Sequence, residues 1–369
     1  MNRFLKNILL LVIACVPGLL TFPAIAQDKQ RILNVYNWSD YIDRKLLARF
    51  TTETGIKVIY DTYDSNEKLE AKLLAGRSGY DLVFPSATFL KRHIEAGIYQ
   101  KLDRKRLKNA SGIWKEIDQQ LAVYDPGNLY AINYMWFTTG IAFNVGKILA
   151  RNGGKPLTSW TSVLAAGELK KFADCGVYFL DSPEDVYSVA LKYLKLDPDS
   201  GNRNDIRKAT QLLQSLTPHI RKFHSSEYIN ALASGDICLA VGWAGDSFQA
   251  RNRAREAKNG VEIDYVIPSE GTLISMDNFA IPKDAQNLVE VYAFIDFLLR
   301  PEIAAQNTRI TNFANGVVTS HKFVEKNILE NKSIYPDSAG LKRLFSVKPR
   351  DPASQRLITR EWIRVKTGR

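Results

Sequence analysis

The chain has 369 residues, a formal net charge of +11 and 45% hydrophobic residues. This length exceeds what one simple hydrophobic core supports, so two lobes are expected. The densest basic run, residues 101–108, is interrupted by Asp103 and has no interleaved aromatic residues. That pattern favours a solvated face and argues against a nucleic-acid partner.

The N-terminus is typical of an export signal. Arg3 and Lys6 precede an uncharged stretch, and Ala24-Ile25-Ala26 forms a small-x-small cleavage site. We therefore predict that residues 1–26 are a signal peptide and that the mature protein is periplasmic. Lipid attachment at Cys15 is the alternative. Beyond the signal, no stretch reaches the ~20 apolar residues that a membrane span needs.

The first hundred residues of the mature chain alternate strands and helices. Strands are predicted at 32–36, 57–63 and 81–84, and helices at 43–52, 67–75 and 89–96. Asp64 and Glu67 resemble a capping box for the second helix. This order predicts an α/β fold with a mainly parallel sheet and helices on both faces.

The middle of the chain continues this alternation. The predicted strands are 129–134, 139–144, 176–180, 236–241 and 261–267, and the predicted helices are 160–163, 168–172, 184–193, 205–216, 225–234, 248–259 and 289–299, the last ended by Pro301. No long flexible linker appears. The lobes are therefore expected to be joined by short strands, with crossings near residues 134–139 and 265–272.

Two aromatic-acidic clusters, residues 36–41 (YNWSDY) and 242–246 (GWAGD), each lie where a predicted strand gives way to a helix. Asp40 and Asp246 could each be a helix N-cap, as could the Ser182–Asp185 segment. Capping does not require the neighbouring tryptophans, however. Because ring faces and carboxylates both attract positive charge, the clusters predict a pocket for an organic cation. Asp277 is a third such acid.

Nothing in the sequence indicates catalysis. The four histidines have no metal-ligand spacing to one another or to the cysteines, and no Gly-x-Ser-x-Gly motif occurs. Residues 140–147 match a phosphate-binding loop poorly. We therefore expect no enzyme activity, no cofactor and no metal site.

Two cysteines, Cys175 and Cys238, remain after signal cleavage. An even count in an oxidising compartment favours a disulfide, and two buried free thiols are the alternative.

Eight segments in order carry a resemblance that covers residues 32–369: YNWSDY (36–41), ETGIKV (53–58), YDLVFPSA (80–87), MWFTTGIAFN (135–144), FLDSPEDV (179–186), FHSSEYIN (223–230), GDICLAVGWAGD (235–246) and LLRPE (298–302). The chain resembles the periplasmic polyamine-binding proteins of ABC importers, most of all the putrescine-binding branch. The resemblance implies a two-lobed, hinged solute-binding fold of type II and a Cys175–Cys238 disulfide. It places lobe 1 at residues 27–137 and 268–312, and lobe 2 at residues 138–267 and 313–369.

The resemblance also implies a ligand-binding set: Trp38, Ser39, Asp40, Tyr41, Ser86, Asp185, Trp243, Asp246, Ser275, Asp277 and Phe313. In this set Asp246 and Asp277 would hold one ammonium, and Ser39 and Asp40 would contact the other, directly or through water. The alkyl chain would lie between Trp38, Tyr41 and Trp243.

Three positions depart from the putrescine-binding pattern. Asp185 replaces a Glu, Ser275 replaces a Phe and Phe313 replaces a Tyr. These changes enlarge or loosen the cleft, so spermidine and agmatine are alternatives to putrescine. The expected function is that of a monomeric, non-enzymatic receptor that delivers a polyamine to a membrane permease. A polyamine sensor on the same fold is the rival interpretation.

Overall fold

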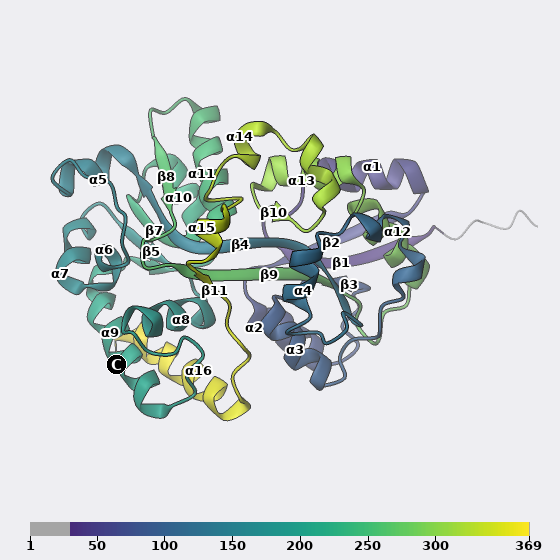
Figure 1. Cartoon of the computed structure of the whole chain (residues 1–369), viewed down its shortest axis with the longest axis horizontal. Helices are drawn as coiled ribbons and strands as arrows, with labels where there is room; N and C mark the ends of the chain where they lie inside the picture. The colour runs from purple at the N-terminus through teal and green to yellow at the C-terminus, as the bar shows by residue number, and fades with distance from the viewer. Residues whose placement is uncertain (1–29, 369) are drawn as a thin grey trace, which may run out of the picture. The chain divides into compact units, whose positions relative to one another are not determined.

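Two long strands, β4 (Ala131–Asn144) and β9 (Thr272–Ala280), run side by side through the middle of the sheet in the computed structural model (Figure 1). The structure describes residues 30–368, and its helices and strands all belong to the compact unit Arg31–Arg369. The expected signal peptide, residues 1–26, and the alternative lipid site at Cys15 therefore lie outside the described residues. The strand order is β2 (Lys57–Tyr63), β1 (Ile32–Trp38), β3 (Leu82–Val83), β9, β4, β7 (Leu239–Trp243), β5 (Val177–Phe179) and β6 (Lys222–Phe223).

One half of the sheet is built on β1 (Ile32–Trp38), which pairs in parallel with β2 (Lys57–Tyr63) and β3 (Leu82–Val83). β3 in turn pairs with β9 in the antiparallel sense. Helices α1 (Arg44–Thr54), α2 (Asn66–Leu74) and α3 (Ala87–Glu95) follow these three strands one by one. The predicted βαβαβα order is therefore present.

The other half of the sheet is built on β7 (Leu239–Trp243), which pairs in the antiparallel sense with residues 139–143 of β4. β7 also pairs in parallel with β5 (Val177–Phe179), which pairs in parallel with β6 (Lys222–Phe223). Shorter strands β8 (Ile263–Val266) and β10 (Ala314–Asn315) join β4, and β11 (Leu344–Phe345) joins β9.

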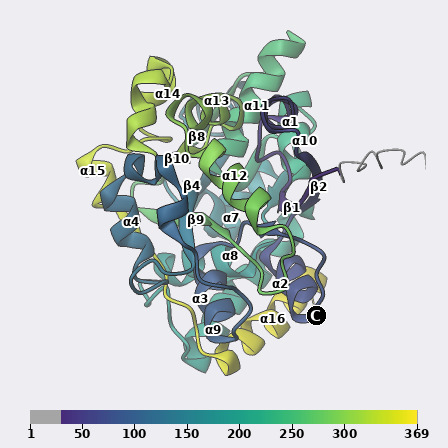
Figure 2. The same ribbon diagram turned by 90° about the vertical axis from the view of Figure 1, so that its right-hand side faces the viewer.

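The remaining α-helices are α4 (Lys115–Leu121), α5 (Val145–Arg151), α6 (Thr161–Leu164), α7 (Ala166–Leu169), α8 (Pro183–Tyr193), α9 (Arg203–Leu216), α10 (Glu227–Ser234), α11 (Ala244–Ala257), α12 (Leu288–Leu298), α13 (Pro301–Thr311), α14 (Lys326–Leu329), α15 (Ser338–Leu341) and α16 (Pro352–Thr367). In both views α11, α13 and α14 lie above the sheet, while α3, α9 and α16 lie below it (Figures 1 and 2).

The predicted α/β fold with a mainly parallel sheet and flanking helices is confirmed. In the described part of the chain, every antiparallel strand pairing involves β4 or β9. The core fills both sides of the sheet. Phe50 of α1 meets Phe294 of α12 with ring centroids 4.9 Å apart, and Trp362 of α16 meets Phe223 of β6 at 5.2 Å.

Several element predictions were wrong. The strands expected at 129–134 and 139–144 form the single strand β4, because the intervening residues are all buried and stay paired with β9. Pro301 follows the end of α12, but it also begins α13, since proline is well tolerated in the first turn of a helix. β9, α13 and α16 were not predicted.

The capping interpretations of Asp40 and Asp64 were also wrong. Asp43, not Asp40, caps α1, because its carboxylate accepts the Lys45 backbone N–H at 3.0 Å. Ser65 caps α2, because its hydroxyl oxygen accepts from the Lys68 backbone N–H at 3.3 Å. Asp40 is therefore free of a capping role.

The Cys175–Cys238 disulfide is confirmed, with the two Cα atoms 5.5 Å apart. The cysteines lie shortly before β5 and β7, two neighbouring parallel strands, so the disulfide ties together the starts of both strands.

Candidate functional site

The two aromatic-acidic clusters meet in the folded chain. Trp38 ends β1, Trp243 ends β7, and their ring centroids lie 5.7 Å apart in an edge-to-face arrangement. Both strands thus deliver a tryptophan at their carboxyl ends, where open α/β sheets bind ligands. Hydrogen bonds orient both rings. The Trp38 indole donates to the carbonyl of Phe84 at 2.9 Å, and the Trp243 indole donates to Asp185 at 3.2 Å.

A cavity lies beside these rings. It contains about 740 Å³ of space free of atoms, part of it open to solvent. Ten of the eleven predicted ligand-binding residues line it: Trp38, Ser39, Tyr41, Ser86, Asp185, Trp243, Asp246, Ser275, Asp277 and Phe313. The eleventh, Asp40, is not among the lining residues.

Aromatic side chains form much of the wall between the two ends of the cavity. Phe313 lies 4.6 Å from Tyr41 and 5.2 Å from Phe137, measured between ring centroids. Phe137 also approaches Trp243 at 5.8 Å and was not predicted as a site residue. Gly245 is required by this packing, because a Cβ atom there would come within 2.2 Å of the Phe313 ring.

One end of the cavity is formed by Asp246 and Asp277, both buried. Ser86 donates to Asp277 at 2.6 Å, and Tyr228 donates to Asp246 at 2.8 Å. Burial raises the pKa of Asp246 to about 8 and that of Asp277 to about 7, and each hydrogen bond opposes the rise. Asp277 adds to the rise at Asp246, because two negative charges in one site repel each other.

Asp246 and Asp277 reach this position by different routes. Asp246 is the third residue of α11, and Trp243 occupies the N-cap position, so the capping interpretation of Asp246 was wrong. Asp277 lies opposite an irregularity in β4, where Asn133 pairs with Asn278, Met135 pairs with Asp277 and the intervening Tyr134 has no partner on β9. Such bulges redirect side chains near functional sites.

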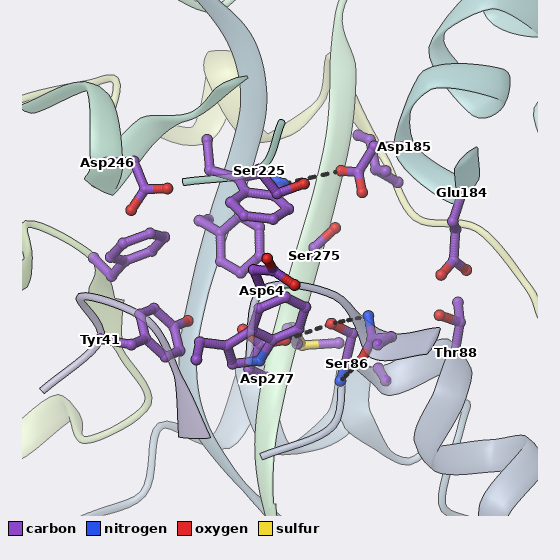
Figure 3. A pocket seen from close by; sticks show the side chains of 18 of the residues that line it. Tyr41, Asp64, Ser86, Thr88, Glu184, Asp185, Ser225, Asp246, Ser275 and Asp277 are labelled. Atoms are coloured by element: carbon purple, nitrogen blue, oxygen red, sulfur yellow. Dashed lines mark hydrogen bonds between the residues drawn. The ribbon is translucent and has the colours of Figure 1, made fainter. Parts of the chain in front are cut away.

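Asp185 and Glu184 lie across the cavity from Asp246, at the start of α8 (Figure 3). Asp185 accepts hydrogen bonds from Thr139 at 2.6 Å and from Ser182 at 2.5 Å, besides that from Trp243. Burial nevertheless raises its pKa. Glu184 was named only as part of a helix start in the sequence, yet it lines the cavity, and burial raises its pKa as well.

The cavity lining contains five carboxylate residues, Asp64, Glu184, Asp185, Asp246 and Asp277, and no lysine, arginine or histidine. This excess is opposite in sign to the net charge of the chain. Asp64 is paired with Lys68, but no described residue forms a salt bridge with the other four of these carboxylates, and such a site with aromatic walls is chemically suited to an organic cation with charges at both ends.

Asp40 and Ser39 lie at the rim of this site. The Asp40 carboxylate is 2.7 Å from the Arg253 guanidinium of α11, and its backbone carbonyl accepts from Gln249 at 3.2 Å. Ser39 lines the cavity, and its hydroxyl donates to the Tyr63 carbonyl at 3.3 Å. The structure thus gives Asp40 a contact with α11 in place of one with the cavity.

Ser275, Phe313 and Asp185 all line the cavity, so the three departures from the putrescine-binding pattern lie together at its wall. Ser275 lies on β9 opposite Phe137 of β4. At the third departure, Glu184 supplies a longer acidic arm one residue before Asp185. No set of three His, Cys, Asp or Glu side chains that could hold a metal ion occurs within residues 30–368.

Comparison with known proteins gives a consistent result. Residues 45–327 match the family model described as bacterial extracellular solute-binding protein. The chain is 48% identical over 347 residues to the putrescine-binding periplasmic protein PotF of Escherichia coli, which covers 92% of this chain and 93% of PotF. It is 45% identical over 370 residues, all of both chains, to the putrescine-binding periplasmic protein SpuD of Pseudomonas aeruginosa.

Solved structures agree with the sequence relatives. A putative spermidine/putrescine ABC transporter protein from Listeria monocytogenes superposes with a TM-score of 0.82 at 28% identity, over 92% of this chain and 100% of that one. The curated relatives are periplasmic substrate-binding proteins and not enzymes. No helix between residues 30 and 368 is long and apolar enough to cross a membrane.

Proposed function

The chain belongs to the bacterial extracellular solute-binding protein family, and from that premise we propose that it is a receptor for putrescine. It captures the diamine in the cavity described above and delivers it to the permease of an ABC importer. The observation that carries this proposal is the cavity lining, which has five carboxylate residues, aromatic walls and no basic residue.

A diamine matches both parts of this lining. Its four methylenes, buried against aromatic rings, contribute roughly 3 kcal/mol at ~0.8 kcal/mol per CH₂. Each ammonium that lies over a ring face gains a further ~0.5–2 kcal/mol. The ammonium groups lose hydration in the cavity, so close carboxylates and complete hydrogen bonding must replace the lost water.

In the proposed complex Asp246 and Asp277 hold one ammonium. The other lies at the opposite wall, toward Asp185 and Glu184, and Ser39 is a further polar residue of the lining. Trp38, Tyr41, Phe137, Trp243 and Phe313 enclose the alkyl chain. The Tyr41 hydroxyl also lines the cavity, and it lowers the pKa of Asp277 against the larger effect of burial there.

The proposed lobes meet within β4. The part of this strand up to Thr138 pairs with β9, and the part from Thr139 onward pairs with β7. The two ends of the strand therefore belong to different halves of the sheet. Lobe 1 would comprise residues 27–137 and 268–312, and lobe 2 residues 138–267 and 313–369. A ligand that contacts both halves favours the closed form over the open one, because it binds the closed form more tightly.

The remaining parts of the proposal concern location and assembly. Residues 1–26 act as the export signal, the mature protein works in the periplasm as a monomer, and its partner is a membrane permease. Periplasmic relatives at 48% and 45% identity support this location.

Isothermal titration calorimetry on the mature protein, unfolded and refolded to remove co-purified ligand, tests the function. We expect saturable heat with putrescine at one site per chain. The absence of heat with putrescine, cadaverine, agmatine and spermidine alike would refute the proposal. Heat with spermidine or agmatine alone would keep the receptor class and reject the diamine.

A further inference from the structure

A second group of acids lies where the cavity opens into a neighbouring groove. Asp64 and Ser225 line both the cavity and this groove. Glu67 of α2 lines the groove, and Glu184 of α8 lines the cavity. Glu67 and Glu184 therefore approach this passage from opposite halves of the sheet. The groove holds about 800 Å³ of space free of atoms, part of it open to solvent.

The two glutamates differ from the other acids around the passage. Asp64 is paired with Lys68 at 2.6 Å, and Asp181 is paired with Lys366 at 2.8 Å. No lysine, arginine or histidine of the described residues forms such an ion pair with Glu67 or Glu184. The nearest arginines, Arg92 and Arg350, act on these glutamates only through longer-range attraction.

The passage is also electrostatically unfavourable when it contains no cation. Burial raises the pKa of Glu67 to about 7, and the Glu184 carboxylate adds to that rise. Arg92 lowers the pKa of both glutamates but does not cancel the effect of burial. A carboxylate whose pKa is raised by burial and by a second carboxylate across a passage is stabilised by a cation.

An independent observation points to a ligand at this place. Ser225 is 5% exposed, and its hydroxyl has no hydrogen-bond partner. A buried hydroxyl without a hydrogen-bond partner is unfavourable, so one that lines a cavity is expected to meet a ligand or water. Figure 3 shows Ser225 among the side chains around the cavity, between Asp246 and Asp185 in that view.

We propose that Glu67, Glu184 and Ser225 form a third ammonium subsite, through which the receptor also binds linear triamines such as spermidine. This inference rests on the proposed diamine function. A diamine fills the cavity from Asp246 to the Asp185 wall, and the additional aminopropyl arm of a triamine passes between α2 and α8. Its terminal ammonium then lies between the two glutamates and donates a hydrogen bond to the Ser225 hydroxyl oxygen.

The first turns of α2 and α8 offer a simpler role for these glutamates, because a carboxylate near a helix N-terminus is favourable in any protein. That role predicts an effect on stability and none on ligand choice. Glu302 provides a matched control, since it is the second residue of α13 as Glu67 is of α2, and it lies outside both hollows.

The experiment compares Glu67→Gln, Glu67→Asp and Glu302→Gln with the unaltered mature protein by calorimetry. The ligands are putrescine, spermidine and N-propylputrescine, which has the propyl arm of spermidine without its terminal amine. We expect Glu67→Gln to raise the Kd for spermidine at least fivefold and to change the Kd values for the other two ligands less than twofold. Glu67→Asp, which keeps the charge in the first turn, should fall between, and Glu302→Gln should match the unaltered protein.

The possible results separate the two proposals. If the unaltered protein binds putrescine but not spermidine, or if Glu67→Gln affects all three ligands equally, the third subsite is refuted and the diamine function stands. If the unaltered protein binds none of the three, the diamine function fails, and the subsite fails with it. A melting temperature for each variant identifies any loss that comes from unfolding.

Discussion

Replacing Asp246 by Asn should weaken putrescine binding at least tenfold at pH 7. The carboxylate is buried at one end of the cavity, and Tyr228 already donates to one of its oxygens at 2.8 Å. Removing one partner of a buried, hydrogen-bonded charge pair typically costs 2–5 kcal/mol. Asn keeps the shape of Asp but presents an uncharged amide to the ammonium.

The raised pKa reduces this loss at neutral pH. With a pKa of about 8, only about one Asp246 in ten is ionised at pH 7 in the unliganded cavity. Binding of the dication must then release a proton, at a cost of about 1.4 kcal/mol. This cost nearly disappears by pH 8.5, whereas Asn does not titrate. The ratio of the two Kd values should therefore widen roughly eightfold between pH 7 and pH 8.5.

Calorimetry in two buffers of different ionisation enthalpy measures both the affinity and the proton release. Asp205→Asn is the matched control, because Asp205 is the third residue of α9 as Asp246 is of α11, and it lies outside the cavity. An unchanged affinity for Asp246→Asn, or a ratio of Kd values that does not change with pH, would refute this reasoning.

The same group makes a prediction about stability. The folded pKa of Asp246 is about 8 and the unfolded value is near 3.9, so between these values the folded state binds more protons than the unfolded state. The contribution of Asp246 to stability therefore falls as the pH rises toward 8. Unliganded Asp246→Asn should melt no lower than the unaltered protein at pH 8.5, which separates lost binding from lost folding.

Three further changes have defined outcomes. Arg253→Met removes the half-exposed ion pair with Asp40, whose charged atoms are 2.7 Å apart. Such a pair contributes about 0.2–1 kcal/mol, so the Kd for putrescine should rise by no more than about fivefold. Titrations in 1 M salt should show no difference between the variant and the unaltered protein. Replacing Cys175 and Cys238 by Ala should lower the unfolding free energy in guanidinium by about 4 kcal/mol, since the disulfide closes a loop with a separation of 63 residues; an unchanged midpoint would contradict this. Ser275→Phe fills part of the cavity wall, so competition titrations should shift toward putrescine and away from spermidine; an unchanged ranking would show that Ser275 does not set the preference.

Much of the fold was predictable because the decisive signals were local. The first strands and helices have clear periodicity and glycine ends, and the structure follows them within a few residues. The prediction failed at β4, where a buried strand has no alternation, and after residue 300, where α13 and α16 were not identified. A strand that crosses between two halves of a sheet is buried on all sides, so its pattern carries no information about where one pairing ends.

The site was predictable in its tryptophans and acids, but not in its geometry. Trp38 and Trp243 stood out because capping does not require them, and the structure brings them together. Phe137 and Glu184 were missed, since an aromatic residue within a buried strand and a glutamate at a helix start both have ordinary structural explanations. Only the fold shows that Phe137 lines the cavity. It also shows that Asp185 already accepts three hydrogen bonds from protein side chains, which leaves Glu184 the more available of the two acids for a ligand.

The acids also explain how a ligand would control closure. Asp277 lies on β9 and Asp246 on α11, in the two proposed lobes, and their charges repel each other at one end of the cavity. Closing the cavity without a cation therefore requires these acids to take up protons or to remain ionised in a poorly hydrated space, and both are unfavourable. A diamine reverses the sign of this interaction, since one of its ammonium groups attracts Asp246 and Asp277 together. The net positive charge of the chain is compatible with this mechanism, because charges more than ~8 Å away are largely screened at physiological salt, whereas the acids in the cavity act at contact distance.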